Sequence, residues 1–367
     1  MKNEHLPELP LASFQVITDT HVRDDADHIH NRHLVQALAD IATFSQGSSG
    51  IMHVGDVTDR GLPAEYRELE RILKQHAENL PDIRYTVGNH DIGAVVFQNP
   101  PLILVEMTAD EVAGLLEQDE VLDSATGFAK TQTAAESAAI IKQLTGGMYK
   151  LPSNLKPDEQ LISEEAAGVE SITVAELWHR RMKHFEDTTG MRGTYHDHWI
   201  DGYHYIFLGT EQPHPKDCEL SAEQLVWLEL TLSEHATPDR PIFLFLHQPL
   251  MNTVAGSMKE QGWYGVNQDA ELKAILTQYP QAILFTGHTH WQLEAQRTMY
   301  DGEGRMPTMF NASSVGYLWT DQDEHLEGSE GLHVEIYKDR VVVKGRNFVT
   351  GEWIEGAEFT VHYPVLD

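Results

Sequence analysis

Five short segments of the sequence carry side chains that commonly bind metal ions. They hold Asp19 and His21, Asp56 and Asp59, Asn89 and His90, His247, and His288 and His290. A lone histidine is more often an ordinary surface or core residue, so the prediction depends on the five segments together. Imidazole and carboxylate ligands without thiolates suit manganese, iron or zinc, whereas calcium and magnesium prefer sites made of oxygen atoms. Manganese and iron are the favoured ions, and zinc is the alternative.

A pair of such ions would support one kind of chemistry in particular. Two divalent cations about 3.5–4 Å apart can deprotonate a water molecule between them near neutral pH. They also neutralise the oxygens of a phosphoryl group during in-line attack. The set of ligands is large enough for two ions that share one carboxylate. We therefore expect hydrolysis of a phosphoester, with a hydroxide bridging two metals as the nucleophile.

The five segments follow apolar runs that are typical of buried strands. The runs are FQVIT at 14–18, IMHV at 51–54, IRYTV at 83–87, IFLFL at 242–246 and AILF at 282–285. Helical patterns at 31–42 and 63–75 separate the first three runs, which predicts βαβ units. Ligands of open α/β sheets bind beyond the carboxyl ends of the strands. We therefore expect the five segments to meet at one edge of the fold.

The second half of the chain predicts more elements of the same kind. A strand is expected at 204–208, and a helix begins after Ser221, a residue type that caps helices well. Another helix is expected at 269–277. Three further strands are expected at 309–312, 332–337 and 340–344.

The segment 92–173 differs from the rest of the chain. It predicts two helices, at 108–117 and 133–144, and it carries none of the five motifs. Loop signals such as Gly146-Gly147 interrupt it. We expect one domain made of 1–91 and 174–367, with 92–173 as a helical insertion that forms a possible cap over the active site.

Composition and charge exclude several classes of protein. The chain has 367 residues, with 26 basic and 57 acidic side chains and a formal net charge of -31. Such a surface repels polyanions, so we expect neither a nucleic-acid polymer nor a membrane as partner, but a small phosphoester substrate.

Because Cys218 is the single cysteine, an internal disulfide is excluded, which suits a reducing compartment. With no apolar run of about 20 residues and no apolar leader near the start, we expect a cytoplasmic protein. The oligomeric state stays open.

The motifs also resemble those of a known family. D-x-H at 19–21, GDxxD at 55–59, GNHD at 88–91, His247, and GHxH at 287–290 occur in this order. This order resembles the calcineurin-like metallophosphoesterase superfamily, and any single motif would be a weak signal. The resemblance implies an α/β fold, a four-layer α/β/β/α sandwich of two mixed sheets. Only the insertion does not match the family.

The resemblance assigns a role to each matching position. Asp19, His21 and His290 would hold the first metal, Asn89, His247 and His288 the second, and Asp56 would bridge both. His90 would face the substrate and protonate the leaving oxygen, which suits an imidazole that titrates near neutrality. Asp59 would pair with His90 and orient it. Arg60 would clamp the phosphate, or it would merely pair with a neighbouring acid.

Departures from individual branches of the superfamily narrow the function. GNHD replaces the GNHE of the serine/threonine phosphatases, and Asp59 stands where purple acid phosphatases have a tyrosine ligand. The chain is most similar to the bacterial cyclic-nucleotide and phosphodiester hydrolase branch, partly through LHQPL at 246–250. We expect a phosphodiesterase. The alternatives are a phosphomonoesterase (a nucleotidase or a sugar phosphatase), a nucleotide pyrophosphatase, and a catalytically inactive binding scaffold.

Aromatic residues near the motifs allow two interpretations. Trp263 and Tyr264 follow His247, and Tyr317 and Trp319 follow the GHxH motif. Aromatic rings beside a metal site could stack on a nucleobase. They could equally pack between a sheet and a loop, and packing is the simpler interpretation.

Overall fold

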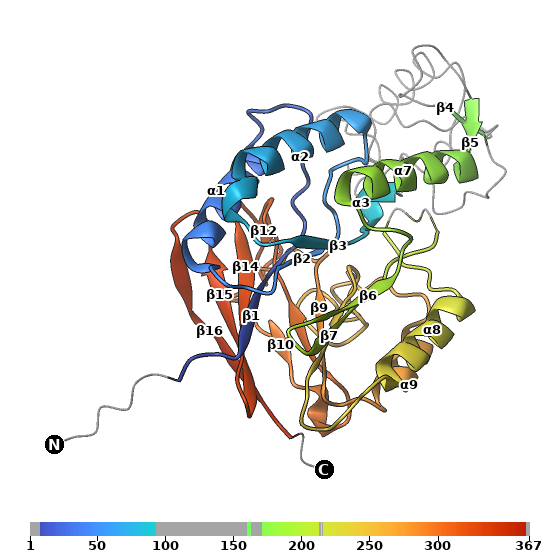
Figure 1. The fold of residues 1–367 in the computed structure, drawn as a ribbon. Helices are drawn as coiled ribbons and strands as arrows, with labels where there is room; N and C mark the ends of the chain where they lie inside the picture. The colour runs from blue at the N-terminus through green and yellow to red at the C-terminus, as the bar shows by residue number, and fades with distance from the viewer. Residues whose placement is uncertain (1–7, 93–159, 163–170, 213, 215, 365–367) are drawn as a thin grey trace.

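The computed structural model describes residues 8–92, 160–162, 171–212, 214 and 216–364. Two six-stranded sheets pack face to face, and helices cover their outer faces (Figure 1). This is the predicted α/β sandwich of two mixed sheets. The predicted cap helices at 108–117 and 133–144 lie outside the described residues, so the insertion and the domain division stay predictions.

The first sheet has the strand order β16-β15-β14-β1-β2-β3. Its strands are β1 (Ala12–Ile17), β2 (Ile51–Val54), β3 (Ile83–Thr86), β14 (Glu330–Ile336), β15 (Arg340–Asn347) and β16 (Glu352–His362). The strands β1, β2 and β3 run parallel, whereas β14 joins β1 in antiparallel fashion. The carboxyl ends of β1, β2 and β3 therefore point to the same edge.

The second sheet has the strand order β10-β11-β9-β8-β7-β6. Its strands are β6 (His196–Ile200), β7 (Tyr203–Phe207), β8 (Ile242–Phe245), β9 (Ala282–Thr286), β10 (Met299–Tyr300) and β11 (Thr308–Asn311). The inner strands β7, β8, β9 and β11 are parallel. This sheet also presents its strand ends along one edge.

Helices form the two outer layers. α1 (Ile29–Phe44), α2 (Pro63–His76) and α7 (Val174–Thr189) lie on the side of the first sheet, and α8 (Ala222–Ser233) and α9 (Asp269–Leu276) cover the second (Figure 1). The predicted cap of α8 is confirmed, because the Ser221 hydroxyl oxygen accepts a hydrogen bond from the Gln224 main chain.

Short elements complete the described chain. They are α3 (Asn89–Ile92), the 3-10 turns η1 (Ala77–Asn79) and η4 (Gly302–Gly304), and the strand pairs β4 (Gln160–Ile162) with β5 (Ser171–Thr173) and β12 (Leu318–Trp319) with β13 (His325–Leu326). The pair β4–β5 lies inside the segment expected to be mostly helical. No helix in the described part of the chain is both long and apolar enough to cross a membrane.

The two faces of each apolar strand pack into two different layers of the hydrophobic core. In β8, Phe243 and Phe245 face the core between the sheets, while Ile242 and Leu244 face the layer under α8 and α9. Side chains of a strand alternate between its two faces, so a strand buried on both faces reads as a continuous apolar run. Phe14 of β1 lies edge-on to the ring of Phe243, with centroids 4.8 Å apart. This contact joins the two sheets directly beneath the first ligand segment.

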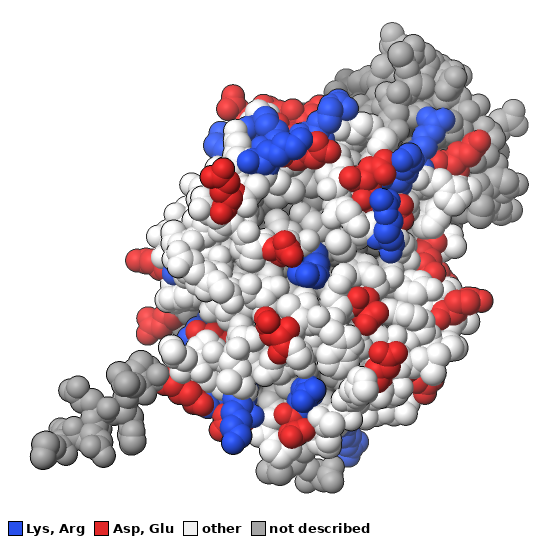
Figure 2. Space-filling model, viewed as in Figure 1, with Lys and Arg blue, Asp and Glu red and all other residues white. Residues whose placement is uncertain are grey.

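Basic side chains on the helices have acidic neighbours. On α2, Arg71 pairs with Glu68 and Lys74 with Glu70. On the face that Figure 2 shows, blue side chains accordingly lie among red ones. The positive charges there are locally compensated.

Candidate metal centre

The two sheets bring the predicted ligands together at their aligned strand ends. Two glycines allow this close approach: a methyl group at Gly88 would overlap the carboxylate of Asp56, and one at Gly287 would overlap that of Asp19. The motif glycines therefore leave room for the neighbouring loop's carboxylate.

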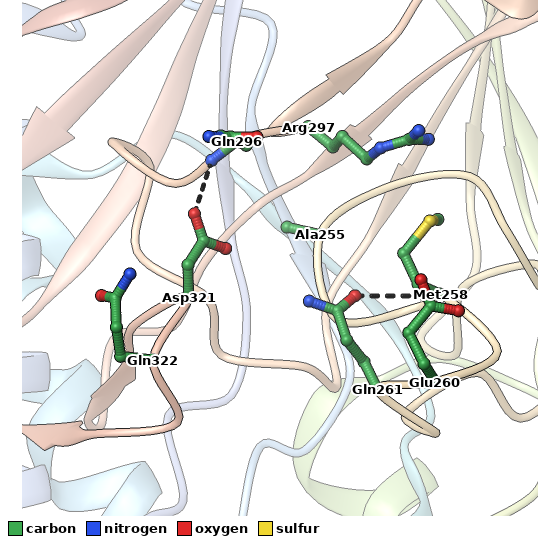
Figure 3. Close-up of a pocket in the computed structure, with 8 residues that line it drawn as sticks. All are labelled: Ala255, Met258, Glu260, Gln261, Gln296, Arg297, Asp321 and Gln322. Atoms are coloured by element: carbon green, nitrogen blue, oxygen red, sulfur yellow. Dashed lines mark hydrogen bonds between the residues drawn. The ribbon is translucent and has the colours of Figure 1, made fainter.

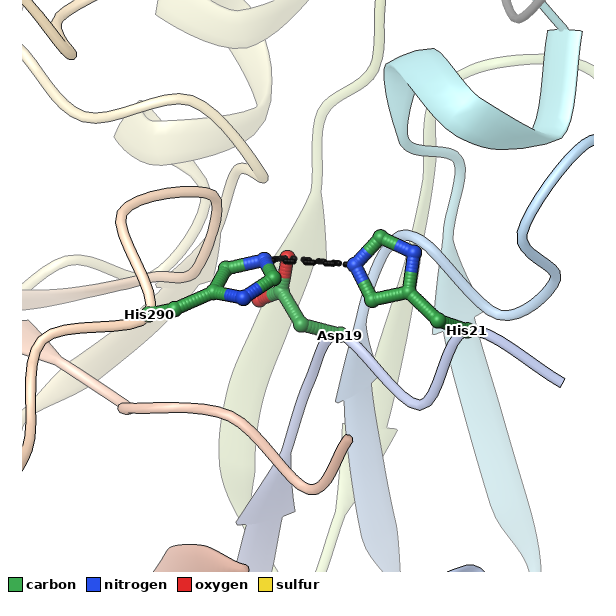
Figure 4. A group of neighbouring side chains, drawn as sticks. All are labelled: Asp19, His21 and His290. Atoms are coloured by element: carbon green, nitrogen blue, oxygen red, sulfur yellow. Dashed lines mark hydrogen bonds and ion pairs between the residues drawn. The ribbon is translucent and has the colours of Figure 1, made fainter. Parts of the chain in front are cut away.

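The first group joins Asp19, His21 and His290 (Figure 4). The Asp19 Oδ1 atom lies 2.9 Å from His290 Nε2 and 3.7 Å from His21 Nε2. The two imidazole nitrogens are 3.2 Å apart. All three side chains are buried. One carboxylate oxygen and two imidazole nitrogens thus converge on one point, as a divalent cation requires.

The second group joins Asp56, His247 and His288. Asp56 Oδ2 lies 3.0 Å from His247 Nε2. The Asn89 Oδ1 atom is 3.1 Å from His288 Nδ1, so Asn89 lies beside this group. Asp56 Oδ2 is also 3.9 Å from His21 Nε2 of the first group. One carboxylate oxygen therefore faces both groups.

Burial and mutual charge set the ionisation of these residues. Burial alone would raise the pKa of Asp19, but the charges of His290 and His247 outweigh it and hold the pKa well below its usual value. The pKa of Asp56 is lowered in the same way, chiefly by His247. Burial would lower the pKa of His247, but Asp56 and Asp19 raise it to about 9. The two carboxylates are thus ionised and ready to bind cations.

Unsatisfied buried atoms show that the residues fit a pair of metal ions. The buried atoms of the described residues that make no well-aligned hydrogen bond include Asp19 Oδ1, His247 Nε2 and His288 Nε2. The first two have only an ionic neighbour, His290 Nε2 at 2.9 Å and Asp56 Oδ2 at 3.0 Å. Such atoms are rare in folded proteins, because a polar atom that loses its hydrogen bonds to water and gains no others lowers the stability of the fold. A metal ion would satisfy acceptor atoms of this kind. The donor set and its burial therefore suit two divalent cations.

The main chain is strained at five of the seven predicted ligands. Asp19, His21, Asp56, His288 and His290 have φ angles of 52°, 43°, 50°, 71° and 59°. This left-handed region is unfavourable for residues with a side chain. Strain of about 1–3 kcal/mol per residue persists only where the surroundings impose it, and it concentrates at functional sites.

His90 lies near both groups, with its ring centroid 4.5 Å from that of His21, and its main chain helps to hold Asp56. The His90 amide donates to Asp56 Oδ1 over 2.9 Å. The His90 Nδ1 atom is 2.7 Å from the main-chain oxygen of Asp59, and His90 Nε2 is 4.0 Å from Asp56 Oδ2. Burial lowers the pKa of His90, but the charges of Asp56 and Asp59 outweigh it, and the net shift is upward.

The carboxylate of Asp59 has partners that the sequence did not predict. It pairs with the guanidinium of Arg23 and lies 3.7 Å from His21 Nδ1. The His90 ring forms its hydrogen bond with the Asp59 main chain, although the Asp59 carboxylate is close enough to His90 and His21 to form a third group of candidate ligands. The predicted pairing of Asp59 with His90 thus runs through the main chain.

Arg60 follows Asp59 and lies at the margin of this cluster. Its Nε atom is 3.8 Å from both Asp59 Oδ2 and Glu65 Oε1. The Nε atom makes no hydrogen bond to any described residue. Its main-chain amide donates to Glu65 Oε2, so the loop that carries Arg60 is held by a buried acid.

Sequence reasoning missed the residue that ties the two central loops together. The carboxylate of Asp91 accepts hydrogen bonds from the main chain of Val57, Thr58 and Gly88. It therefore joins the loop of Asp56 to the loop of Asn89. The position of Asp91 in the GNHD motif was a signal, but its partners cannot be read from the sequence.

Aromatic rings flank the metal centre on two sides. The Tyr317 ring lies 4.3 Å from the ring of His290 and 5.7 Å from that of His21. The Trp263 ring lies 6.0 Å from the ring of His288. Each metal group thus has one aromatic neighbour, and Trp263 keeps 41% of its surface exposed.

A separate pocket opens on the loops that follow β8, β9 and β12 (Figure 3). It has a volume of about 300 Å³ and is lined by Ala255, Met258, Glu260, Gln261, Gln296, Arg297, Asp321 and Gln322. None of the ten predicted site residues lines it. The candidate chemistry therefore lies outside this pocket.

Comparisons with known proteins agree with this geometry. The family model described as calcineurin-like phosphoesterase matches residues 13–292. No curated protein matches the chain.

Solved structures provide a second comparison. A purple acid phosphatase isolated from yellow lupin (Lupinus luteus) seeds has a TM-score of 0.53 and 12% sequence identity, and the match covers 97% of this chain and 55% of that one. The chain thus spans about half the length of the lupin protein. PhoD has a TM-score of 0.45 at 11% identity, with 97% of this chain and 69% of that chain covered. At such low identity, the likeness to the lupin structure shows the fold alone.

Proposed function

Because the chain belongs to the calcineurin-like phosphoesterase family, we propose that it hydrolyses a small phosphodiester, such as a cyclic nucleotide, with two divalent metal ions. The observation that carries the proposal is the position of Asp56. Its Oδ2 atom lies 3.0 Å from His247 Nε2 in one ligand group and 3.9 Å from His21 Nε2 in the other. An oxygen atom that faces both groups can be shared by two ions.

The ligand sets follow the two groups. Asp19, His21 and His290 would hold one ion, Asn89, His247 and His288 the other, and Asp56 would contact both. Manganese or iron is favoured, and zinc is the alternative, because imidazole and carboxylate ligands suit these ions. When bound, the ions would supply positive charge for the phosphoryl oxygens and would lower the pKa of water to near neutrality.

The remaining residues would handle the proton and the substrate. His90 Nδ1 donates to the Asp59 carbonyl oxygen, and the His90 Nε2 atom, which lies 4.0 Å from Asp56 Oδ2, would protonate the departing alkoxide. Its raised pKa favours the protonated ring that this role needs. Arg60 would bind a phosphoryl oxygen, because guanidinium groups form two parallel hydrogen bonds to phosphate.

The preference for a diester rests on similarity to one branch of the family. It is tested by comparing the hydrolysis of bis-p-nitrophenyl phosphate and p-nitrophenyl phosphate by metal-free protein reconstituted with manganese. Faster cleavage of the diester is expected. Faster cleavage of the monoester would make the protein a phosphomonoesterase. No cleavage of either, also with iron or zinc, would favour a binding scaffold.

The charge of the chain supports a small substrate rather than a nucleic-acid polymer, since the formal net charge is -31. We also propose a cytoplasmic location, because the single cysteine, Cys218, is buried as a free thiol. Cell fractionation tests the location, and recovery outside the cytoplasm would contradict it.

A further inference from the structure

Lys216 places a positive charge beside the second group of metal ligands. Its ammonium donates a hydrogen bond to the carbonyl oxygen of Gly262. An ammonium group has three N–H donors, and this is the one hydrogen bond that the described residues give it. Two donors of Lys216 therefore remain for a ligand.

Two aromatic rings lie beside this ammonium. Lys216 Nζ lies 5.6 Å from the ring centroid of Trp263 and 5.8 Å from that of Tyr264. At these distances the ring faces attract a cation. Because Trp263 is 41% exposed, part of its surface is open to solvent.

This cluster is linked to the metal centre through side chains. The Trp263 ring lies 6.0 Å from the ring of His288. The Gln248 amide nitrogen donates to Asn89 Oδ1 over 3.3 Å and to the main-chain oxygen of Lys216 over 3.1 Å. Lys216 and Trp263 therefore form one wall beside the second ligand group.

We propose that Lys216 and Trp263 form a substrate subsite in which the ammonium binds a phosphoryl oxygen and the indole stacks on a planar ring of the substrate. Nucleoside phosphoesters carry both features, an anionic phosphoryl group and a flat heterocycle. The inference rests on the proposed phosphoester substrate and deepens it by assigning the residues that would bind the phosphoryl group and the heterocycle of a nucleoside phosphoester.

The test measures binding rather than turnover, so it does not depend on the proposed activity. The probes are methylphosphonate and the phosphonate analogue of adenosine 5′-monophosphate, in which a methylene replaces the ester oxygen and prevents hydrolysis. Dissociation constants are measured by calorimetry on manganese-loaded protein whose metal content is known. Lys216→Met should weaken both probes about tenfold, because a charge-assisted hydrogen bond is lost. Trp263→Ala should weaken the nucleoside probe about tenfold and leave methylphosphonate within about twofold.

Matched variants separate this role from a loss of structure. Lys216→Arg keeps the charge and should restore much of the binding. Lys259→Met and Trp199→Ala are the controls, because Lys259 is exposed and Trp199 has a similar exposed fraction of 40%. Neither control should change either affinity.

Three results would overturn the subsite. They are unchanged binding of both probes by Lys216→Met, equal weakening of both probes by Trp263→Ala, and no measurable binding of either probe to the unmodified protein. Failure of the proposed function looks different, because the diester would then be cleaved more slowly than the monoester, or neither would be cleaved, while the probes still bind.

Discussion

The imidazole of His90 is held by the main-chain oxygen of Asp59, 2.7 Å from its Nδ1 atom, and not by the Asp59 carboxylate. The carboxylate pairs instead with Arg23. Since a carbonyl oxygen can only accept, Nδ1 of His90 carries a proton. The tautomer of His90 is thus defined by the path of the main chain.

Replacing His90 tests its role as an acid. His90→Asn removes the titratable proton, so kcat should fall about 100-fold or more. The manganese content, measured by atomic absorption, should stay unchanged, because His90 is not among the proposed ligands. A variant that lost metal together with activity would make His90 a ligand.

Replacing Asp59 should have a smaller effect. Asp59→Asn keeps the main-chain oxygen that holds His90, so kcat should fall less than about tenfold, which is below the roughly 100-fold or more that one proton-transfer group contributes. Steady-state kinetics of both variants under identical conditions measure the difference. If Asp59→Asn is as damaging as His90→Asn, the carboxylate rather than the carbonyl positions the imidazole.

Metal binding should stabilise the folded protein. Manganese at about 100 times its dissociation constant should raise the free energy of unfolding by about 2.7 kcal/mol, seen as a higher melting temperature after chelator treatment and reloading. Asp56→Asn should lose most of this increase. Asp197→Asn, which alters a carboxylate paired with His204 in the second sheet, is the control and should keep it. An equal increase in all three proteins would place the metal elsewhere.

Asp91 should be essential for stability. Asp91→Ala leaves the buried amides of Val57, Thr58 and Gly88 without their acceptor. Each such loss is about 1–3 kcal/mol, so urea unfolding of the metal-free protein should show a decrease of about 3 kcal/mol or more. Asp82→Ala removes an exposed carboxylate and should change stability by less than about 0.5 kcal/mol. Similar values for the two variants would refute the role of Asp91 as a tie between loops.

Glu330 should make stability depend on pH. Burial raises the pKa of Glu330 to about 7, despite hydrogen bonds from Leu293 and Ser313. The folded state therefore binds the proton more tightly than the unfolded state, whose carboxyl titrates near 4.5. The stabilisation is complete below about pH 4.5 and is lost as the pH rises through about 7.

Glu330→Gln isolates this effect, because the amide keeps an acceptor for Leu293 and Ser313 but cannot ionise. Relative to the variant, the unmodified protein should lose up to about 3 kcal/mol between pH 5 and pH 8. Denaturant unfolding at several pH values measures the difference. Glu327→Gln, at an exposed position, is the control. Parallel pH curves for the unmodified protein and Glu330→Gln would contradict the shift.

Strands buried on both faces could be predicted from the sequence, and exposed ones could not. The run at 242–246 predicted β8 because both faces of that strand lie in a core. The strand β16 (Glu352–His362) was missed. It lies at the edge of its sheet and is exposed along most of its length. Its apolar residues therefore show neither a continuous run nor a clean alternation.

Some features of the site could likewise be predicted from the sequence, and others could not. The meeting of the predicted ligands at one edge could be predicted because each one comes shortly after a strand. The partner of Asp59 could not, because a bridge between Val22 and Thr58 brings Arg23 beside it. Lys216 was missed because contacts between loops cannot be read from the sequence, which does not tell which loops of the second sheet meet near His288.

The separation of the ligands along the chain has a consequence for biosynthesis. His21 and His290 meet although they stand 269 positions apart, and each belongs to a different sheet. While the ribosome is still translating the region before His290, the nascent chain carries an incomplete first ligand set. The first metal ion can bind to its full ligand set only after translation has passed His290 and the two sheets have docked. Metal loading is therefore expected to be post-translational.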